Sequence, residues 1–175
     1  NLVEEVAKLR AARRLWARLM KEKYNSSNPR TQMMRFHLQT AGSTLTAQQP
    51  ENNIVRVTIQ ALAGILAGAQ GLHTNSKDEA FGLPTEETAM LALRTQQVIA
   101  YESGVTETVD PMGGSYYLES LTDEIEAKVV DYLDTIEAFG DNMLEAVVNA
   151  LEQGFFHKEL ADASYKHHKE VEKRE

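Results

Sequence analysis

Two short runs of polar residues, about thirty positions apart, carry the side chains in this sequence that are best suited to chemistry. The first is 37–42, His-Leu-Gln-Thr-Ala-Gly, and the second is 71–79, Gly-Leu-His-Thr-Asn-Ser-Lys-Asp-Glu. Each run falls where a strand is expected to give way to a helix. In repeating strand–helix folds, the carboxyl ends of the strands assemble the functional site. The two runs therefore predict two sectors of one pocket.

Neutral side chains dominate both runs. Gln39, Thr40 and Gln70 offer amide and hydroxyl groups that suit recognition of an amide or carbonyl, and that equally suit the capping of strand ends. Few charges and many amides are unusual for a hydrolytic site. They are typical of a pocket that positions a cofactor which brings its own reactivity.

Glu79 is the most specific candidate among the charged residues. Its carboxylate follows a strand end, where it could accept hydrogen bonds from two ribose hydroxyls or act as a base. A charge at a helix N terminus is the structural alternative. Gly42 and Gly82 would let the backbone approach a large flat ligand, unless they only form turns. The sequence has no nucleophile–base pair, Walker loop or Rossmann fingerprint.

His37 and His73 are expected at corresponding places in the two runs. A metal site with two histidines is conceivable, but the usual ligand spacing is absent and no carboxylate lies at a matching offset. We therefore favour hydrogen-bonded histidines in the mouth of a barrel. His157, His167 and His168 lie in a charged terminal helix, where we expect them to be exposed.

Composition limits the classes of protein. The chain has 175 residues, 42% of them apolar, and no cysteine, which excludes disulfide frameworks, thiolate catalysis and iron–sulfur ligation. This suits a reducing compartment, so we expect the cytoplasm, or the mitochondrial matrix in a eukaryote. No apolar run approaches the length of a membrane span, and no signal-peptide pattern opens the chain.

The net charge of −8 conceals a basic N-terminal segment. Residues 1–36 carry nine lysines and arginines against three glutamates. A basic first helix either contacts phosphate or pairs with the acidic remainder of the chain, and we favour the pairing. No aromatic interleaving or known motif accompanies the charges, so nucleic acid is not an expected partner.

Hydrophobic periodicity and turn residues predict the order of the elements. We expect an amphipathic helix over 2–23, a turn over 25–29, a strand over 33–38, a helix over 52–68 and a second strand end over 71–75. Thr85 is then the N-cap of a helix through about 101, residues 110–115 form a glycine loop, and Thr122 caps the following helix. Gly140 and Gly154 separate two further helices.

Alternating helices and strands predict parallel strands with crossover helices, and therefore an α/β fold. Two strands do not close a barrel, so we expect the later strands and helices of a (β/α)8 TIM-type barrel, followed by a helical extension. Residues 1–120 are assigned to the second half of the barrel and residues 121–175 to a C-terminal helical extension of the same domain. The many small residues within 61–69 suit close packing of that helix against the sheet.

Several long motifs resemble one family. They are the runs 37–42 and 72–80, the segment 45–56 (Leu-Thr-Ala-Gln-Gln-Pro-Glu-Asn-Asn-Ile-Val-Arg), the segment 109–116 (Val-Asp-Pro-Met-Gly-Gly-Ser-Tyr) and the basic segment 5–16. The likeness covers about residues 4–170. It is specific for the adenosylcobalamin-dependent acyl-CoA mutases, and the motifs resemble the large, catalytic subunit of methylmalonyl-CoA mutase.

The resemblance implies a β/α barrel stacked on a cobalamin-binding domain, with adenosylcobalamin as cofactor and an acyl-CoA substrate threading the barrel axis. In this family a radical released from the cofactor abstracts hydrogen from the acyl-CoA, whose carbon skeleton then rearranges. The barrel excludes water and holds the radicals. The implied isomerase converts methylmalonyl-CoA to succinyl-CoA. Isobutyryl-, hydroxyisobutyryl- and ethylmalonyl-CoA mutases are alternatives, as is a non-catalytic half-barrel that binds cofactor or a partner.

The resemblance also assigns residues, position by position. Gly42 matches the glycine that lies against the corrin, and Glu79 matches the glutamate that hydrogen-bonds the adenosyl ribose. The residues implied in cofactor binding are Gln39, Gly42, Glu79, Ala80 and Gly82, and those implied in substrate binding are His37 and Gln70. Ser43 stands where the family often has tryptophan, which changes the expected packing around the corrin.

Other parts of the family's machinery are expected outside this chain. No catalytic residue is assigned within 1–175, and no metal ligand either, because the histidine that binds cobalt is expected elsewhere. We expect the chain alone to be inactive. It would need the other half of the barrel and a cobalamin-binding domain or small subunit, within a homo- or hetero-oligomer. Without them, apolar sheet edges would be exposed.

Overall fold

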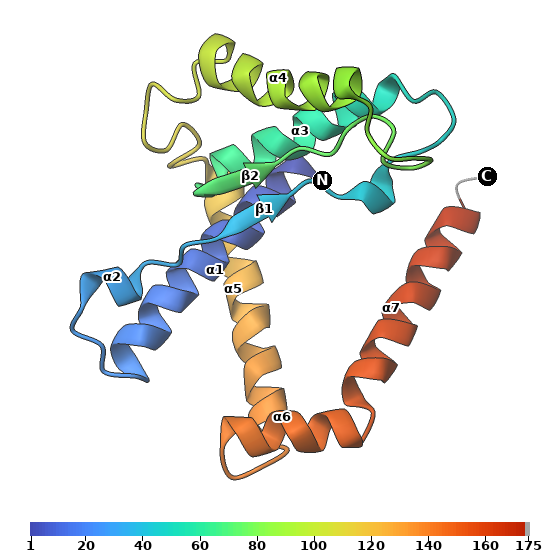
Figure 1. Ribbon diagram of the computed structural model, residues 1–175. Helices are drawn as coiled ribbons and strands as arrows, with labels where there is room; N and C mark the ends of the chain where they lie inside the picture. The colour runs from blue at the N-terminus through green and yellow to red at the C-terminus, as the bar shows by residue number, and fades with distance from the viewer. Residues whose placement is uncertain (174–175) are drawn as a thin grey trace. The chain divides into compact units, whose positions relative to one another are not determined.

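The computed structural model describes residues 1–173. The elements in chain order are α1 (Leu2–Glu22), α2 (Pro29–Gln32), β1 (His37–Gln39), the 3-10 helix η1 (Gly42–Thr44), α3 (Asn52–Leu66), β2 (Gly71–His73), α4 (Glu86–Glu102), α5 (Tyr116–Glu137), α6 (Met143–Glu152) and α7 (Phe155–Glu172). They form two compact units, residues 1–126 and 127–175, with the boundary inside α5 (Figure 1). None of the helices described combines the length and apolar character that a membrane span requires.

The sheet of the first unit consists of β1 and β2, which pair in parallel and lie side by side in Figure 1. His37 pairs with Gly71, and Gln39 pairs with His73. Because α3 connects the two strands, the predicted strand–helix–strand unit of an α/β fold is confirmed. The first strand, predicted over 33–38, is only three residues long and begins at His37.

A short helix that was not predicted from the sequence precedes β1. α2 begins at Pro29, and its N-cap Asn28 accepts a hydrogen bond from the Arg30 N–H at 3.0 Å. Proline is favoured at the first helical position because that N–H has no partner within the helix. Residues 33–36 connect α2 to β1, and Phe36 O already accepts a hydrogen bond from the Gln70 N–H at 3.2 Å.

The two faces of the sheet have different neighbours. Leu38 and Leu72 point toward α3, since a Cβ placed on Gly64 would lie 2.9 Å from Leu38 Cδ1 and 3.6 Å from Leu72 Cδ1. Side chains alternate along a strand, so Gln39 and His73 lie on the opposite face, where both are exposed. One face therefore packs against a helix, and the other is free for polar side chains.

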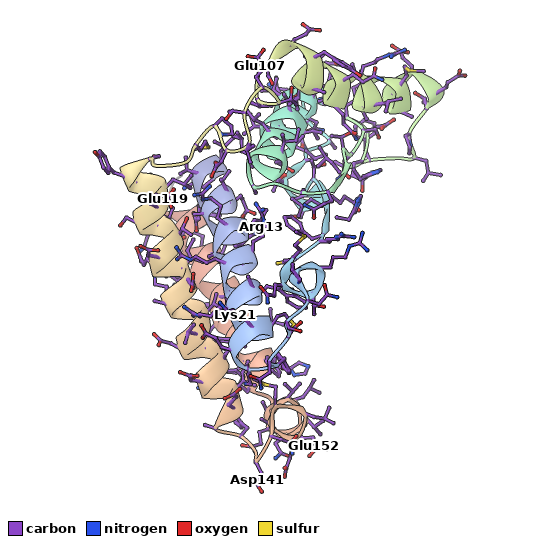
Figure 2. All side chains as sticks on the ribbon, turned by 90° about the vertical axis from the view of Figure 1, so that its left-hand side faces the viewer. Arg13, Lys21, Glu107, Glu119, Asp141 and Glu152 are labelled. Atoms are coloured by element: carbon purple, nitrogen blue, oxygen red, sulfur yellow. The ribbon has the colours of Figure 1, made fainter. Side chains whose placement is uncertain are left out.

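Small residues let α3 approach its neighbours closely. Four of them are buried, namely Ala61, Ala63, Gly64 and Ala67. The predicted close packing of this helix against the sheet is confirmed at Gly64. The adjacent hydrophobic core joins α1, α3 and the start of α5 through Val6, Ala7, Ala63 and Leu118. α1 and the first turns of α5 run side by side (Figure 2).

The N termini of α4 and α5 give opposite outcomes for the capping predictions. Thr85 caps α4 as predicted: its hydroxyl accepts from the Thr88 N–H at 3.2 Å, and Thr88 Oγ1 accepts from the Thr85 N–H at 2.8 Å. The prediction that Thr122 caps the next helix is wrong, because α5 begins at Tyr116. Thr122 is buried within the helix, and its hydroxyl donates to Leu118 O at 2.7 Å, which satisfies the side chain without ending the helix.

The second unit contains the end of α5 followed by α6 and α7. Gly140 and Gly154 precede these two helices as predicted, and Gly154 adopts a left-handed backbone with φ of +74°. Aromatic rings pack inside this unit. The Phe155 ring centroid lies 5.3 Å from that of Phe139 and 5.7 Å from that of Tyr132. The two helices predicted after Gly140 are thus confirmed.

The described residues form a mostly helical structure with a small parallel sheet, as expected for part of an α/β domain. The division into a half-barrel and an extension between 120 and 121 stays a prediction. α5 runs through both positions without a break.

We expect Gly64→Val to lower the free energy of unfolding by about 1–3 kcal/mol, because the added carbons would overlap Leu38 in a packed interface. Urea unfolding followed by circular dichroism measures the change. Gly82→Ala is the control, since no atom lies within 4 Å of its Cβ position. Equal stability of the two variants would show that α3 does not press against the sheet.

Candidate functional site

Asn75 joins the carboxyl ends of the two strands. Its side-chain oxygen accepts a hydrogen bond from Gln39 Nε2 at 2.9 Å, and its Nδ2 donates to Thr40 O at 2.9 Å. Its backbone N–H donates to Thr40 Oγ1, also at 2.9 Å. Because Asn75 is only 2% exposed and Thr40 is 6% exposed, the two bonds between them are shielded from water, and they fix the two strand ends relative to each other.

Gly42 and Glu79 meet directly beside this amide. A Cβ placed on Gly42 would lie 3.1 Å from Glu79 Cγ and 3.2 Å from Asn75 Nδ2. Any larger residue would therefore have to displace one of them. The two polar runs of the sequence thus come together at one edge of the sheet, with Gln39, Asn75, Gly42 and Glu79 as a contiguous cluster. We call these four residues the strand-end cluster.

The space around the strand-end cluster is open. A cavity of about 230 Å³ lies beside it, lined by His73 and Glu79 and by residues of α4 that include Gln96. Beyond Glu79 the chain presents exposed apolar side chains, with Phe81 56% and Leu83 90% exposed. Apolar surface next to a small cluster of polar groups is characteristic of sites for organic ligands.

Ala80 and Gly82 belong to this exposed segment. Both are exposed to solvent, and nothing lies within 4 Å of the Cβ position of Gly82. The backbone here is therefore accessible to a ligand, unlike that of Gly42, which is in close contact with Glu79.

His37 and Gln70 lie at the opposite, amino-terminal end of the strands. Gln70 accepts a hydrogen bond from the Phe36 N–H at 3.0 Å and donates to Gly68 O at 2.7 Å. The expectation that His37 and His73 occupy corresponding places is wrong. His37 opens β1 while His73 closes β2, because the strands pair in a register that sets His73 opposite Gln39.

No cluster of three or more histidine, cysteine or acidic side chains that could hold a metal ion occurs within 1–173. The strand-end cluster offers amides, a glycine backbone and one carboxylate. Its chemistry is therefore hydrogen bonding and close contact.

Asn75 was not singled out from the sequence, although it lies within the second run. Its signal is its position, since it is the second residue after β2. At that point a side-chain amide can supply the hydrogen bonds that the ended strand no longer makes.

Asp78 anchors the segment that carries Glu79. Its buried carboxylate accepts hydrogen bonds from Ser76 Oγ and, at 2.7 Å, from Thr88 Oγ1 of α4. Burial alone would raise the pKa of Asp78. The hydrogen bonds from Ser76, Thr88 and the backbone outweigh burial and hold this pKa below its ordinary value. The charged form of Asp78 is therefore the one that the fold stabilises.

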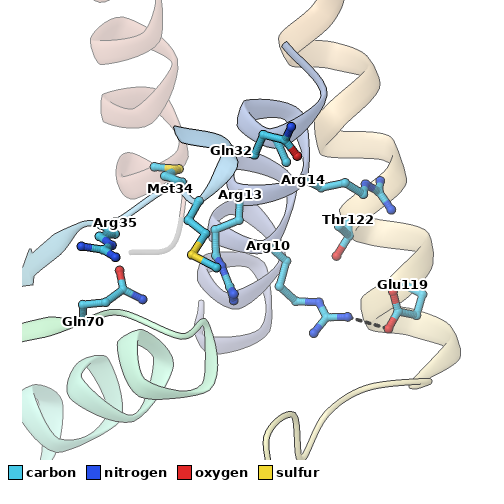
Figure 3. A pocket seen from close by; sticks show the side chains of 11 residues that line it. Arg10, Arg13, Arg14, Gln32, Met34, Arg35, Gln70, Glu119 and Thr122 are labelled. Atoms are coloured by element: carbon cyan, nitrogen blue, oxygen red, sulfur yellow. Dashed lines mark hydrogen bonds and ion pairs between the residues drawn. The ribbon is translucent and has the colours of Figure 1, made fainter. Parts of the chain in front are cut away.

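A second, larger cavity of about 570 Å³ lies away from the strand-end cluster, beside α1 and the start of α5 (Figure 3). Its lining includes Arg10, Arg13 and Arg14 of α1, together with Arg35 and Gln70. The partners of these arginines show which of the two alternatives for the basic N-terminal segment holds, contact with phosphate or pairing with acidic residues.

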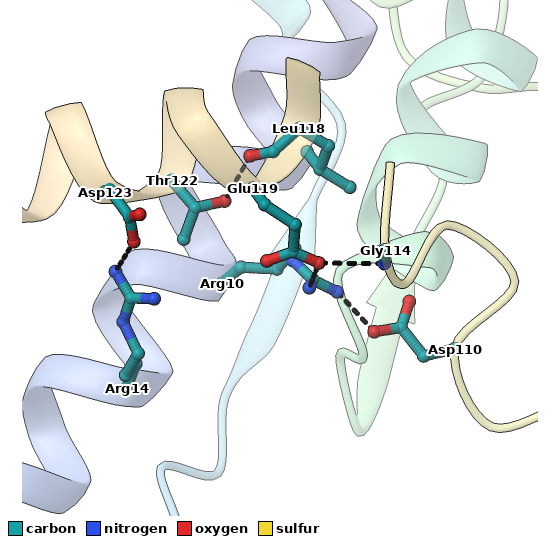
Figure 4. Close-up of polar contacts among 8 residues, drawn as sticks. All are labelled: Arg10, Arg14, Asp110, Gly114, Leu118, Glu119, Thr122 and Asp123. Atoms are coloured by element: carbon teal, nitrogen blue, oxygen red, sulfur yellow. Dashed lines mark hydrogen bonds and ion pairs between the residues drawn. The ribbon is translucent and has the colours of Figure 1, made fainter. Parts of the chain in front are cut away.

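The α1 arginines are largely engaged within the chain (Figure 4). Arg10 pairs with Asp110 and, at 2.7 Å, with Glu119, while Arg14 pairs with Asp123 at 2.6 Å. A backbone hydrogen bond from Gly114 and the bond from Arg10 hold the pKa of Glu119 below its ordinary range. The pairing of the basic helix with the acidic remainder is confirmed for these residues.

Two further arginines of α1 serve neighbouring helices. Arg18 pairs with the buried Glu126 at 2.7 Å. Arg13 donates to Ala67 O at 3.1 Å, at the C terminus of α3, where a cation favourably opposes the helix dipole. The arginines of α1 thus bind α1 to the C terminus of α3 and to the first turns of α5.

Comparison with known proteins identifies the class. The family model described as methylmalonyl-CoA mutase matches residues 1–175, so the chain belongs to the methylmalonyl-CoA mutase family. The strand-end cluster and the motifs around it lie entirely within the matched region.

Individual relatives agree with this assignment. The chain is 50% identical over 165 residues to the 2-hydroxyisobutanoyl-CoA mutase large subunit of Aquincola tertiaricarbonis, an alignment that covers 94% of this chain and 28% of the relative. It is 49% identical over 151 residues to the probable mitochondrial methylmalonyl-CoA mutase of Caenorhabditis elegans, covering 86% and 20%. It is 48% identical over 147 residues to methylmalonyl-CoA mutase of Rhizobium meliloti, covering 84% and 20%. The chain thus spans between 20% and 28% of the length of these curated relatives.

We expect Asp78→Asn to destabilise the protein by about 1–2 kcal/mol at neutral pH, because it removes charge-assisted acceptance from Ser76 and Thr88. The folded-state pKa of Asp78 is lowered. The advantage of the parent protein should therefore be complete above the ordinary aspartate pKa of about 4, and should vanish as pH falls through the lowered value.

Denaturant unfolding of both proteins between about pH 2 and 7 measures this difference. Asp141→Asn, at an exposed loop position, is the matched control. A stability difference that grows on acidification would contradict the assignment.

Proposed function

We propose that this chain is part of an adenosylcobalamin-dependent acyl-CoA mutase, an isomerase that rearranges the carbon skeleton of an acyl-CoA thioester. Membership of the methylmalonyl-CoA mutase family supports the proposal. The single structural observation that carries it is the contact of Gly42 with Glu79 beside the Gln39–Asn75 hydrogen bond. This arrangement places a glycine, a carboxylate and an amide in contact at one edge of the sheet.

The residues present fit adenosylcobalamin. A corrin is broad and flat, and small residues let the backbone approach it closely. Gly42, Ala80 and Gly82 are such residues, and exposed Phe81 and Leu83 provide apolar contact. When bound, adenosylcobalamin supplies an organic radical by homolysis of its cobalt–carbon bond. No ligand to cobalt is assigned to this chain.

The roles of the chain's own groups follow from their chemistry. Glu79 would accept hydrogen bonds from the hydroxyls of the adenosyl ribose, since a carboxylate has acceptors only. Gln39 would hold a carbonyl or hydroxyl near the cofactor with its neutral amide. Both groups would hold the reacting partners in place and exclude water, without taking part in bond making.

The sheet supports a place within a (β/α)8 barrel. β1 and β2 pair only with each other among the described residues, and their polar face carries exposed His37, Gln39 and His73. Further strands would continue the sheet on both sides, with residues 1–120 as the second half of the barrel and 121–175 as a helical extension. The polar face would then line the barrel interior.

His37 and Gln70 are proposed to contact the substrate. They lie at the amino end of the strands, below the strand-end cluster. An extended acyl-CoA lying along the barrel axis would pass both ends of the strands. His37 would then face the thioester chain at the amino end of β1, and Gln39 would face it at the carboxyl end.

Methylmalonyl-CoA, giving succinyl-CoA, is the proposed substrate, and a related branched acyl-CoA is the alternative. The relatives from Aquincola tertiaricarbonis and Rhizobium meliloti are named for different acyl-CoA substrates, at 50% and 48% identity. The proposed partners are the remaining half of the barrel and a cobalamin-binding domain or small subunit. The proposed location is the cytoplasm, or the mitochondrial matrix in a eukaryote.

We expect Glu79→Gln to weaken adenosylcobalamin binding about tenfold, because an amide accepts ribose hydrogen bonds less strongly than a carboxylate. Binding of hydroxocobalamin, which lacks the adenosyl group, should stay unchanged. Isothermal titration of the full-length subunit with its cobalamin-binding partner measures both. Glu86→Gln, in the first turn of α4, is the control. Equal effects on the two cobalamins, or none, would remove Glu79 from the ribose site.

The same full-length complex, loaded with adenosylcobalamin, should interconvert methylmalonyl-CoA and succinyl-CoA. Turnover is followed by chromatography of the thioesters, with 2-hydroxyisobutyryl-CoA and isobutyryl-CoA run in parallel. Preference for one of these would identify the related mutase. Absence of turnover with every thioester, despite bound cofactor, would contradict the mutase proposal.

A further inference from the structure

Asn53, in the first turn of α3, is a buried amide between the two segments that carry the strand-end cluster. Its residue surface is 0% exposed, and it is among the largest fully buried side chains of the described chain. A buried amide is costly unless its donors and acceptors are satisfied. The stability of the fold around Asn53 therefore depends on its hydrogen-bond partners.

Every polar group of the Asn53 amide has a partner. Oδ1 accepts hydrogen bonds from the Thr46 N–H at 3.1 Å and from Arg56 Nη1 at 2.8 Å. Nδ2 donates to Thr46 O at 2.8 Å and to Lys77 O at 2.9 Å. Two donors and two acceptor sites are thus all in use, which is the full capacity of an asparagine.

These partners belong to two different loops. Thr46 follows η1, whose first residue is Gly42. Lys77 lies two residues before Glu79 on the segment after β2. One side chain therefore ties the loop of Gly42 to the loop of Glu79, on the helix side of both. Asp78 holds the second loop to α4, by accepting a hydrogen bond from Thr88 Oγ1.

We propose that Asn53 is a positioning residue that sets the distance between Gly42 and Glu79, and thereby the affinity for the adenosyl group of the cofactor. The inference rests on the proposed function. The two residue types of similar size do not meet the same requirement: aspartate offers no donor to the Lys77 and Thr46 carbonyls, and leucine offers no polar group at all. The 3.1 Å approach of Glu79 to the Gly42 Cβ position leaves little room for the loops to shift.

The test compares Asn53→Asp with Asn52→Asp in the full-length subunit with its cobalamin-binding partner. Asn53→Asp keeps the shape and the acceptor, but loses the donations to Thr46 O and Lys77 O. Asn52 is exposed, and its side-chain amide donates to Gln49 Oε1 at 2.9 Å, so it is the matched control. The probes are adenosylcobalamin and hydroxocobalamin, with the KM for acyl-CoA as a third readout.

Asn53→Asp should weaken adenosylcobalamin binding about tenfold or more, while hydroxocobalamin binding and the KM for acyl-CoA change less than about twofold. Asn52→Asp should change none of them. Adding Glu79→Gln to Asn53→Asp should weaken adenosylcobalamin binding little further, because the carboxylate is already misplaced. Should Asn53→Asp not fold, Asn53→Ser, which keeps one hydroxyl donor, carries the same comparison.

Equal loss of both cobalamins, with an additive effect of Glu79→Gln, would overturn the inference and leave Asn53 as a structural residue. If Glu79→Gln is selective for adenosylcobalamin and Asn53→Asp is not, only the role of Asn53 falls. If Glu79→Gln itself is not selective, the ribose assignment fails, and the inference fails with it.

Discussion

Buried side-chain amides hold the carboxyl ends of β1 and β2 together. Each strand is only three residues long, so the ladder between them supplies few hydrogen bonds. Beyond the strands, Asn75 and Thr40 continue the connection with side-chain bonds in a site closed to water. Leaving any of these groups unpaired would cost about 1–3 kcal/mol. The geometry of the strand-end cluster depends on this constraint.

The helices make the constraint possible. Gly64 lets α3 lie against Leu38 and Leu72, so that the apolar face of the sheet is covered and Gln39 is directed to the other face. The basic residues of α1 stabilise another part of the fold. Arg10 pairs with Asp110 of the glycine loop and with Glu119 at the start of α5. Packing against α3 and the exposed polar side chains thus occupy opposite faces of the same short sheet.

Much of this arrangement could be predicted from the sequence. The order of elements, the parallel pairing and the Thr85 cap follow from local signals, namely periodicity, turn residues and capping chemistry. The start of α5 could not be predicted, because the sequence does not distinguish a threonine that caps a helix from one within it. The hydroxyl of Thr122 donates to Leu118 O inside the helix. The register of His37 and His73 depends on where each strand begins, and the unpredicted α2 precedes β1.

Only part of the candidate site could be predicted, because some of its residues stand out by type and others act through contacts distant in the sequence. Residues on short polar runs, such as Gln39 and Glu79, stand out by type. Asn53 and Asn75 bond to backbone groups far along the chain, and such tertiary bonds leave no periodic trace in the sequence. Asn53 in particular lies in a helix, where its amide looks like an ordinary first-turn residue.

Residue-resolved hydrogen exchange of the full-length protein without cofactor tests the central claim most directly. We infer that the strand ends are already joined before any ligand binds. The N–H groups of Thr40, Thr46 and Asn75, which donate to His73 O, Asn53 Oδ1 and Thr40 Oγ1, should therefore be strongly protected in the free protein. Exchange of these amides at the rate of exposed loops, with protection appearing only after adenosylcobalamin is added, would contradict this inference.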